Sequence, residues 1–291
     1  MRSTVQAGQP HLKHVTDRYS APLSRAEQRE FVPFVHELIG LAFATIRRYF
    51  LSGTTVATKA DASPVTLADR EAETAMRALI ERRYPDHGIV GEEHGVKNGR
   101  RYRWVLDPVD GTRAFITHCF LFGTLIALER DDGAGHRPVL GAIAHAAPGL
   151  ALIGHGDRCT LYADDGSERR ARVRPCARVA EATVLATTHW STGEQRGRAA
   201  TERIETVIRL ARLYRTWGDC FGYFALATGG ADLMLDPTLA HWDVAAIVPV
   251  VEAAGGKVTS WSGGDPLAEL SLIASAGGLH DEVLRLLHRS N

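Results

Sequence analysis

The sequence predicts an α/β chain in which two sheets alternate with pairs of helices. Two amphipathic helical segments come first, followed by consecutive short apolar runs separated by turn residues, and the last third alternates strand-like with helix-like segments. Neighbouring strands joined by short turns predict an antiparallel N-terminal sheet, whereas the later alternation predicts an α/β C-terminal half. At 291 residues, 45% of them hydrophobic, the chain is long enough to bury a core of this size.

The N-terminal part begins with a polar segment and two helices. Residues 1–23 are mixed in composition without sustained periodicity, and we interpret them as a disordered tail. Order begins at Ser24, the first residue of a Ser-x-x-Glu capping box. Apolar residues then recur at helical spacing to about Phe50. A second helix begins near Thr66 and ends before Pro85.

The middle of the chain has a strand-like pattern. Residues 88–91 and 103–106 are short apolar runs between turn residues, and each predicts a strand. The same pattern predicts four further strands, the first two as a long hairpin, at 122–129, 138–147, 150–153 and 170–173. We assign residues 24–177 to an N-terminal α+β half that carries most of the acidic motifs described below.

From about residue 178 strands and helices alternate, and we assign 178–291 to a C-terminal α/β half. Strands are expected near Val184 and Tyr214 and at 231–235, 258–260 and 272–274. Helices are expected at 194–211, 221–227 and 244–254 and from His280 onward. Gly229-Gly230 and Gly255-Gly256 stand where glycines end helices.

Charge and cysteine content exclude several functional classes. Lys+Arg 34 balances Asp+Glu 34, so the basic excess that supports nucleic-acid binding is missing. The four cysteines lie far apart without a CxxC pair, which argues against a zinc cage or a disulfide scaffold. No apolar run reaches the roughly 18 residues needed to cross a bilayer, and the first residues lack a signal-peptide core. We therefore expect a cytoplasmic protein with neither a nucleic-acid nor a membrane partner.

Acidic residues cluster at the predicted strand ends and helix starts. The clusters are Thr66-Leu-Ala-Asp69, Gly91-Glu92-Glu93-His94, Asp107-Pro-Val-Asp110-Gly-Thr112 and Trp242-Asp243. Taken singly, three of them have a structural interpretation. Asp69 completes a capping box, Asp107 before a proline is typical of a helix N-cap, and Asp243 is placed to cap the helix that follows.

Taken together, the clusters predict a metal site. Glu92 and Glu93 end a strand, where no cap is needed, and Asp107 directly follows an apolar run. These three carboxylates have no Lys or Arg beside them in sequence, so they repel one another when crowded unless a cation neutralises them. Oxygen ligands without His or Cys select Mg²⁺ or Mn²⁺ over zinc. Gly111-Thr112 opens a turn whose N–H groups can hold phosphate oxygens, and the whole set is therefore equipped to hydrolyse a phosphate ester.

Three motifs resemble the signatures of the inositol monophosphatase superfamily. They are GEEHG at 91–95, WVLDPVDGTRAFI at 104–116 and HWDVAAIVPVVEAAGG at 241–256, in the family's order and spacing. The resemblance extends from about residue 30 to the end of the chain. It implies a layered αβαβα sandwich, hydrolysis of a small phosphate monoester by metal-activated water, two or three Mg²⁺ ions with Mn²⁺ as a substitute, and a homodimer.

The resemblance also implies roles for individual residues. The implied Mg²⁺ ligands are Glu92, Asp107, the backbone carbonyl of Val109, Asp110, Asp243 and, through water, Asp69. Glu93, Thr112 and Asp69 form the implied catalytic set, in which Glu93 and Thr112 orient and deprotonate the attacking water. The amides of Gly111 and Thr112 hold the phosphate. Lys59 belongs to a segment that folds over the site in relatives, although a solvated surface lysine is an equally good interpretation.

Residues 217–237 resemble the histidinol-phosphate phosphatase branch of this superfamily. They read Trp-Gly218-Asp219-Cys-Phe-Gly-Tyr, later followed by Leu-Met-Leu-Asp236-Pro. Histidinol phosphate carries an ammonium and an imidazole that can be protonated, and a carboxylate at Asp219 with Asp236 nearby would complement that charge. Gly218, Asp219 and Asp236 are therefore predicted substrate residues, together with Gly111 and Thr112. A helix N-cap for Asp219 and a turn for Asp236 stay open as structural interpretations.

Three functions remain open from the sequence. The first is histidinol-phosphate hydrolysis in histidine synthesis. The second is hydrolysis of inositol-1-phosphate, a bisphosphate nucleotide or a sugar bisphosphate on the same scaffold. The third is a non-catalytic Mg²⁺-binding regulatory protein, and the presence of both the metal-ligand set and the water-activating pair argues against it.

Overall fold

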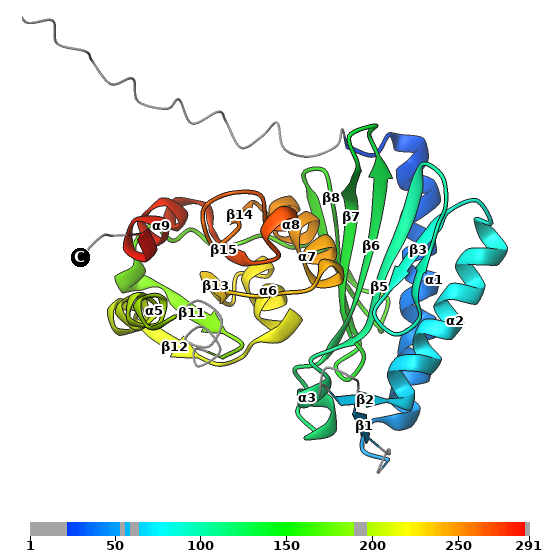
Figure 1. The fold of residues 1–291 in the computed structure, drawn as a ribbon, viewed down its shortest axis with the longest axis horizontal. Coiled ribbons are helices and arrows are strands. Elements are labelled where there is room, and N and C mark those ends of the chain that lie inside the picture. Colours follow the sequence, from blue (N-terminus) through cyan, green and yellow to red (C-terminus); the bar gives the residue numbers. More distant parts are fainter. Residues whose placement is uncertain (1–21, 53–55, 59–63, 189–196, 289–291) are drawn as a thin grey trace, which may run out of the picture.

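The computed structural model describes residues 22–52, 56–58, 64–188 and 197–288, and these form five layers (Figure 1). Helices α1 (Arg25–Tyr49) and α2 (Leu67–Arg83) cover one face of an eight-stranded sheet. Helices α6 (Asp219–Ala227) and α7 (His241–Ala253) lie between that sheet and a five-stranded sheet. Helices α5 (Arg198–Leu210) and α9 (His280–His288) cover the outer face of the smaller sheet. The expected αβαβα layering is confirmed.

The eight-stranded sheet has the strand order β10-β9-β8-β7-β6-β5-β3-β4. Its strands are β3 (Gly88–Gly91), β4 (Gly95–Lys97), β5 (Tyr102–Asp110), β6 (Gly123–Asp131), β7 (His136–His145), β8 (Leu150–His155), β9 (Arg158–Ala163) and β10 (Glu168–Arg170). All neighbours pair antiparallel except β3 and β5, which are parallel. The exception arises because the edge strand β4 reverses the chain on the outer side of β3, so that β5 returns in the direction of β3.

The five-stranded sheet has the order β12-β11-β13-β15-β14. Its strands are β11 (Thr183–Ala186), β12 (Leu213–Arg215), β13 (Leu233–Asp236), β14 (Gly256–Thr259) and β15 (Leu272–Ala276). Strands β12, β11 and β13 are parallel, and β15 is antiparallel to both of its neighbours. The alternating α/β pattern of the C-terminal half therefore produces a mixed sheet.

Several short elements differ from the sequence-based expectation. The strand expected at 170–173 is wrong: β10 ends at Arg170, and β9 before it was not anticipated. All three residues of β10 are exposed, so they carry no alternating pattern. Further elements of three to five residues, too short for a periodic signal, include β1 (Val56–Thr58), β2 (Pro64–Thr66), β4, α3 (Thr112–Ile116) and α8 (Pro266–Glu269). The expected start of α5 at 194 lies outside the described residues.

The N-terminal tail ends earlier than expected. Leu23, which we assigned to the tail, is 3% exposed and belongs to the core beneath α1. Its carbonyl also accepts a hydrogen bond from Nε2 of Gln28 at 2.8 Å. A single apolar residue in a polar segment gives no periodic signal, which is why the sequence did not reveal it. Residues 1–21 of the predicted tail lie outside the described part of the chain.

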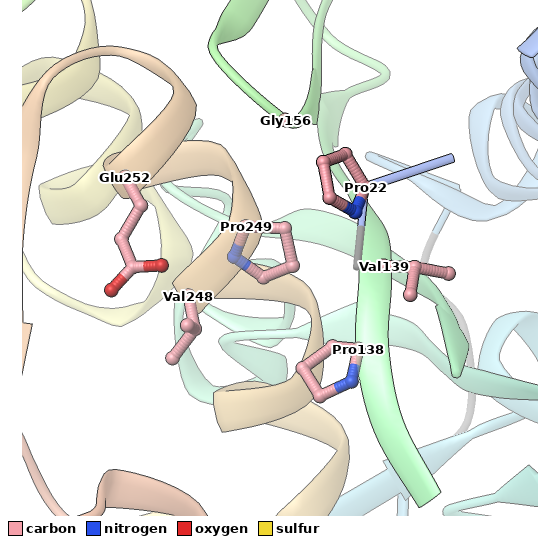
Figure 2. Close-up of a pocket in the computed structure, with 7 residues that line it drawn as sticks. All are labelled: Pro22, Pro138, Val139, Gly156, Val248, Pro249 and Glu252. Carbon is pink, nitrogen blue, oxygen red and sulfur yellow. The ribbon is translucent and has the colours of Figure 1, made fainter. Parts of the chain in front are cut away.

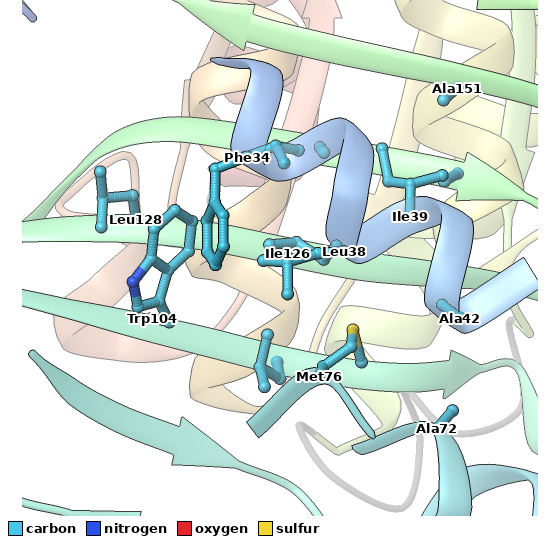
Figure 3. Packing of buried hydrophobic residues seen from close by; sticks show 14 of the residues in the cluster. Phe34, Leu38, Ile39, Ala42, Ala72, Met76, Trp104, Ile126, Leu128 and Ala151 are labelled. Atoms are coloured by element: carbon cyan, nitrogen blue, oxygen red, sulfur yellow. The ribbon is translucent and has the colours of Figure 1, made fainter. Parts of the chain in front are cut away.

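The first core lies between α1, α2 and the large sheet (Figure 3). Phe34 of α1 packs edge-on against Trp104 of β5, with ring centroids 5.2 Å apart. Met76 of α2 is fully buried in the same cluster, next to the α1 residues that line this layer (Figure 3). The capping boxes at Ser24 and Thr66 fix where the two helices begin. This packing holds α2 against β5, and both carry predicted site residues.

The second core surrounds α7, which is buried on nearly all sides between the two sheets. Two glycines permit its close approach to the large sheet. A Cβ on Gly141 would lie 2.1 Å from the carbonyl oxygen of Ala246, and one on Gly154 would lie 2.5 Å from Cα of Val250. The start of α7, which carries Asp243, is positioned by this contact. Although α7 is apolar, no helix in the described part of the chain is both long and apolar enough to span a bilayer.

Candidate active site

Three aspartates converge where the large sheet meets α7. Asp107 and Asp110, at the end of β5, and Asp243, in the first turn of α7, each offer a carboxylate oxygen within 4.8 Å of the others. Strand β5 continues through both acids, so the N-cap interpretation of Asp107 is wrong. Helix α7 begins at His241 instead of 244 and its N-cap is Ala240, so the interpretation of Asp243 as the cap of a helix that follows it is wrong; Asp243 lies in the first turn and accepts the amide of Ala240 at 2.7 Å. We call these three residues the aspartate cluster.

The electrostatics of the aspartate cluster favour a bound cation. Burial raises the pKa of Asp107 well above its usual range, and Glu92 raises it further. The pKa of Asp110 is also raised well above its usual range, mainly by burial and next by the neighbouring Asp219. The pKa of Asp243 rises to about 7, again mainly through burial. Oδ1 of Asp107 is buried without a hydrogen-bond partner, and within the described ranges no Lys or Arg forms an ion pair with the cluster. Crowded, desolvated carboxylates of this kind fit a hard divalent cation.

Glu92 and Glu93 lie in the turn between β3 and β4. The amide of Glu92 donates to the carbonyl of Leu106 at 3.2 Å, which holds the turn beside β5, and Glu92 is close enough to raise the pKa of Asp107. The side chain of Glu93 is 3% exposed, and Nε of Arg70 lies 3.9 Å from its Oε2. The structure therefore places Glu92 next to the aspartate cluster and Glu93 in the adjoining turn.

Asp69 is buried in the first turn of α2, where its Oδ2 accepts the amide of Thr66 at 2.9 Å. The predicted capping box is therefore confirmed. Burial raises the pKa of Asp69 to about 6, and the nearby Glu93 contributes to the rise. Asp69 thus lies near Glu93, although it is not a member of the aspartate cluster. Lys59, for which a position over the site and a solvated surface position were both open, lies outside the described residues.

The turn after β5 combines a left-handed glycine with a short helix. Gly111 has φ 77°, a conformation that favours glycine, and it is the N-cap of α3. The hydroxyl of Thr112 donates to the carbonyl of Val109 at 3.1 Å. A carbonyl oxygen accepts at two positions, so this hydrogen bond is compatible with the metal-ligand role expected for Val109. Gly111 and Thr112 therefore follow the aspartate cluster directly in the chain.

A cavity of about 170 Å³ adjoins the aspartate cluster. Its lining includes Asp110, Asp219, Asp236 and Asp243, and none of its described lining residues is a Lys, Arg or His. Asp236 ends β13, is 4% exposed and accepts the hydroxyl of Tyr223 at 2.8 Å. Burial raises the pKa of Asp236 to about 7. The cavity is thus strongly acidic, and it connects both predicted specificity acids to the predicted metal site.

Asp219 has an unusual backbone. Its φ is 49°, and its amide donates to Oγ1 of Thr187 at 2.9 Å. The N-cap of α6 is Gly218, with no side-chain capping bond, so the interpretation of Asp219 as the N-cap is wrong. A Cβ on Gly218 would lie 2.1 Å from Cα of Thr187, which explains the glycine at this position. Burial raises the pKa of Asp219, and Arg113 lowers it. Asp219 thus lines the acidic cavity with a left-handed backbone.

Other residues at the site were not anticipated. Thr187 and Tyr223 line the acidic cavity, and Glu73 of α2 binds the turn that carries Glu93. Their partners lie far away in sequence, so no local motif indicates their role.

A second cavity, of about 100 Å³, lies between α7 and β7 and is lined mainly by apolar groups such as Pro138, Val248 and Pro249 (Figure 2). None of the predicted site residues lines this second cavity.

Comparisons with known proteins agree with the geometry. Residues 27–291 match the family model described as the inositol monophosphatase family. The chain is 35% identical over 267 residues to the bifunctional phosphatase IMPL2, chloroplastic, of Arabidopsis thaliana, covering 90% of this chain and 73% of that protein. It is 33% identical to a histidinol-phosphatase of Streptomyces coelicolor, covering 84% of this chain and 92% of that one. Among solved structures, an inositol monophosphatase from Zymomonas mobilis is similar with a TM-score of 0.78 and 33% identity, covering 91% of this chain and 100% of that one.

Proposed function

The chain belongs to the inositol monophosphatase family, and we propose that it is a Mg²⁺-dependent phosphomonoesterase that hydrolyses histidinol phosphate to histidinol and phosphate. One observation carries the choice of substrate. The cavity beside the aspartate cluster is lined by four aspartates, with Asp219 and Asp236 on its walls. Phosphate esters with a cationic leaving group suit such a cavity, and histidinol phosphate is an ester of that kind.

The predicted metal ligands suit Mg²⁺ because they are all oxygen donors. Glu92, Asp107, Asp110, Asp243 and the carbonyl of Val109 would hold two or three ions, with Asp69 reaching one through water. Bound Mg²⁺ would lower the pKa of the attacking water and stabilise charge on the departing oxygen. The buried, unpartnered Oδ1 of Asp107 supports this assignment because a cation would satisfy it.

The remaining chemistry belongs to the side chains and amides of the chain. Glu93, buried in the turn beside the cluster, takes the proton of the attacking water, which Thr112 helps to orient. The amides of Gly111 and Thr112 hold the phosphate. The water oxygen bonds to phosphorus while the bond between phosphorus and the histidinol oxygen breaks, and the histidinol oxygen takes up a proton from solvent water and leaves as an alcohol. No covalent enzyme intermediate is needed for this in-line displacement.

The acidic cavity also argues against bisphosphate substrates. A second phosphate there would face several carboxylates, and the described lining residues offer no cation to neutralise it. An ammonium or imidazolium group gains a charge-assisted hydrogen bond at the same position. Burial raises the pKa of Asp219 and Arg113 offsets part of that rise, so a bound ammonium or imidazolium would supply the positive charge that favours the ionised carboxylate.

Inositol-1-phosphate is the second candidate substrate. The solved structure at 33% identity is described as an inositol monophosphatase, and carboxylates also accept hydrogen bonds from polyol hydroxyls. A polyol needs no negative charge, however. Bound Mg²⁺ would neutralise Asp110 and Asp243, which leaves Asp219 and Asp236 as the carboxylates of the cavity that favour a cationic leaving group.

The test is phosphate release from a panel of esters with purified protein, in Mg²⁺ and in excess EDTA. We expect turnover of histidinol phosphate in Mg²⁺ and none in EDTA. Faster turnover of inositol-1-phosphate would select the second candidate, and no turnover of any ester would support the non-catalytic alternative.

We also propose a homodimer and a cytoplasmic location, which the family resemblance and the proposed role in histidine synthesis suggest. Light scattering and fractionation test these two points.

A further inference from the structure

We propose that Glu73 is a positioning residue that holds the turn carrying Glu92 and Glu93 in its working geometry. This inference rests on the proposed function, because the roles of Glu92 and Glu93 belong to it. Glu73 lies on α2, and its side chain is 0% exposed. A carboxylate so deeply buried is costly unless its oxygens are satisfied, so its partners indicate why it is there.

The partners of Glu73 are the backbone of the turn and an arginine. Oε2 accepts the amide of Glu93 at 2.8 Å, and Oε1 accepts the amide of His94 at 3.2 Å. Nε of Arg77, one helical turn further along α2, donates to Oε1 at 2.6 Å. One carboxylate therefore binds two consecutive amides of the turn while Arg77 balances its charge. The turn lies within the catalytic region, but Glu73 reaches it only through the backbone.

Two neighbouring residues are adapted to this contact. A Cβ on Gly91 would lie 2.0 Å from Oε1 of Glu73, so only glycine leaves room for the carboxylate. Arg77 also donates to the carbonyl of Gly95, at the far end of the turn. The pair formed by Glu73 and Arg77 thus binds the turn at its amides and again at a carbonyl. Rotation of the turn would break contacts at both ends.

The position of Glu73 on α2 links the turn to Asp69. The two residues are four apart and lie on the same side of the helix, since both are almost fully buried. Asp69 begins the helix through its capping box, and it is close enough to Glu93 to respond to its charge. Helix α2 therefore fixes Asp69 and the Glu92–Glu93 turn relative to each other. Partners that orient ligands in this indirect way typically change metal affinity by about 10- to 100-fold when they are removed.

The experiment compares Glu73→Gln with Glu71→Gln, a matched control on the same helix. Glu71 is exposed and pairs with Arg48 and Tyr49, away from the turn. In Glu73→Gln the amide group turns a donor toward a backbone N–H or toward Arg77, so one contact is lost without a change in size. We expect the amides of residues 93 and 94 to lose hydrogen-exchange protection in Glu73→Gln alone. Magnesium affinity by calorimetry should fall about 10- to 100-fold, and kcat should fall more than KM rises.

Unchanged protection at residues 93 and 94 together with wild-type magnesium affinity would overturn the proposal. So would equal losses in Glu71→Gln, which would indicate a general defect of α2. If Glu73→Gln does not fold, Gly91→Ala gives the same information, because its Cβ displaces the carboxylate while leaving the charge in place. Hydrogen exchange needs no turnover. Suppose that the wild type has no phosphatase activity, but its amides at 93 and 94 are protected and lose protection in Glu73→Gln. That result would refute the proposed function and leave the positioning role supported.

Discussion

The carboxylate of Asp219 lies against Gly111: a Cβ atom built on Gly111 would be 2.9 Å from Oδ2 of Asp219. The two residues are more than a hundred positions apart, one at the start of α6 and the other at the start of α3. Both have positive φ, 49° for Asp219 and 77° for Gly111. This contact brings the proposed specificity acid beside the turn proposed to hold the phosphate. The two residues nevertheless have different proposed roles, so changes to them should have distinguishable effects.

Asp219→Asn should reduce activity only toward cationic substrates. The substitution keeps the size of the side chain and removes its charge. The lost charge-assisted hydrogen bond is worth about 1.5–3 kcal/mol, or roughly 10- to 150-fold in kcat/KM for histidinol phosphate. Slow hydrolysis of p-nitrophenyl phosphate should barely change because its leaving group never meets Asp219. Equal losses on both esters would assign Asp219 to structure and leave the substrate as a small phosphate monoester.

Gly111→Ala should reduce activity on every substrate. An alanine at this position must adopt a left-handed backbone, which costs about 1–2 kcal/mol of folding free energy. Its Cβ also collides with Asp219. Gly133→Ala is the matched control: its φ is 88°, and no atom lies within 4 Å of the place where its new Cβ would stand. Both variants should lose stability in thermal melts, Gly111→Ala the more because of its collision with Asp219, but only Gly111→Ala should lose kcat. Full activity of Gly111→Ala would contradict the phosphate-holding turn.

Removal of metal should abolish hydrolysis, and Asp110→Asn should mimic that loss. We expect at least a ~10²-fold fall in kcat for Asp110→Asn, because several kcal/mol of charge stabilisation are removed. In EDTA the same variant should melt at a higher temperature than the wild type, since one of the crowded carboxylates is gone. Asp157→Asn, at an exposed position, should change neither property. Retention of full activity in excess EDTA would refute the metal assignment.

The metal-free protein should become less stable as pH rises toward neutrality. The pKa values of Asp236 and Asp243 are raised from 3.8 to about 7, so the folded chain binds more protons than the unfolded chain between these values. Their favourable contribution is complete below about 4 and is lost as pH passes through 7. Buried histidines such as His145, with a pKa lowered to about 4, act in the opposite direction at acidic pH. The informative quantity is therefore the difference in melting temperature between Mg²⁺ and EDTA.

That difference should widen from pH 5 to pH 8, because Mg²⁺ stabilises the ionised form of Asp243 and does nothing for a protonated one. Differential scanning fluorimetry at intervals of half a pH unit measures it. In EDTA, Asp236→Asn should reduce the fall of the melting temperature with rising pH. It should not remove the stabilisation by Mg²⁺, because Asp236 is not a proposed ligand. A difference that stays constant with pH would show that the aspartate cluster is ionised without metal.

The layered fold could be predicted from the sequence because its main elements are long or strongly periodic. Helix α1 has a clear buried stripe, and the hairpin of β6 and β7 consists of long apolar runs. Strands such as β10, with every residue exposed, carry no such pattern and were missed. Leu23 was missed for a related reason, since one apolar residue makes no period.

The candidate site, too, could be predicted from the sequence only in part. Asp107, Asp110 and Asp243 lie within recognisable motifs, so their convergence could be expected before the structure was known. The contacts that fix their surroundings could not. Glu73 binds amides about twenty residues away, Tyr223 donates to Asp236, and Asp219 lines the cavity with a left-handed backbone that no local motif predicts. Relationships of this kind depend on packing between α2, α6 and the sheets, which local sequence does not encode.

The ratio of kcat/KM for histidinol phosphate to that for inositol-1-phosphate, measured at saturating Mg²⁺, decides whether the acidic cavity selects a cationic substrate. Both esters present the same phosphate to the aspartate cluster and to Gly111, and they differ in the charge that enters the acidic cavity. If the acidic cavity selects a cationic leaving group, the ratio should be at least about 10 in favour of histidinol phosphate, the factor expected from one charge-assisted hydrogen bond. A ratio below one would contradict this selection and assign the chain to inositol-1-phosphate.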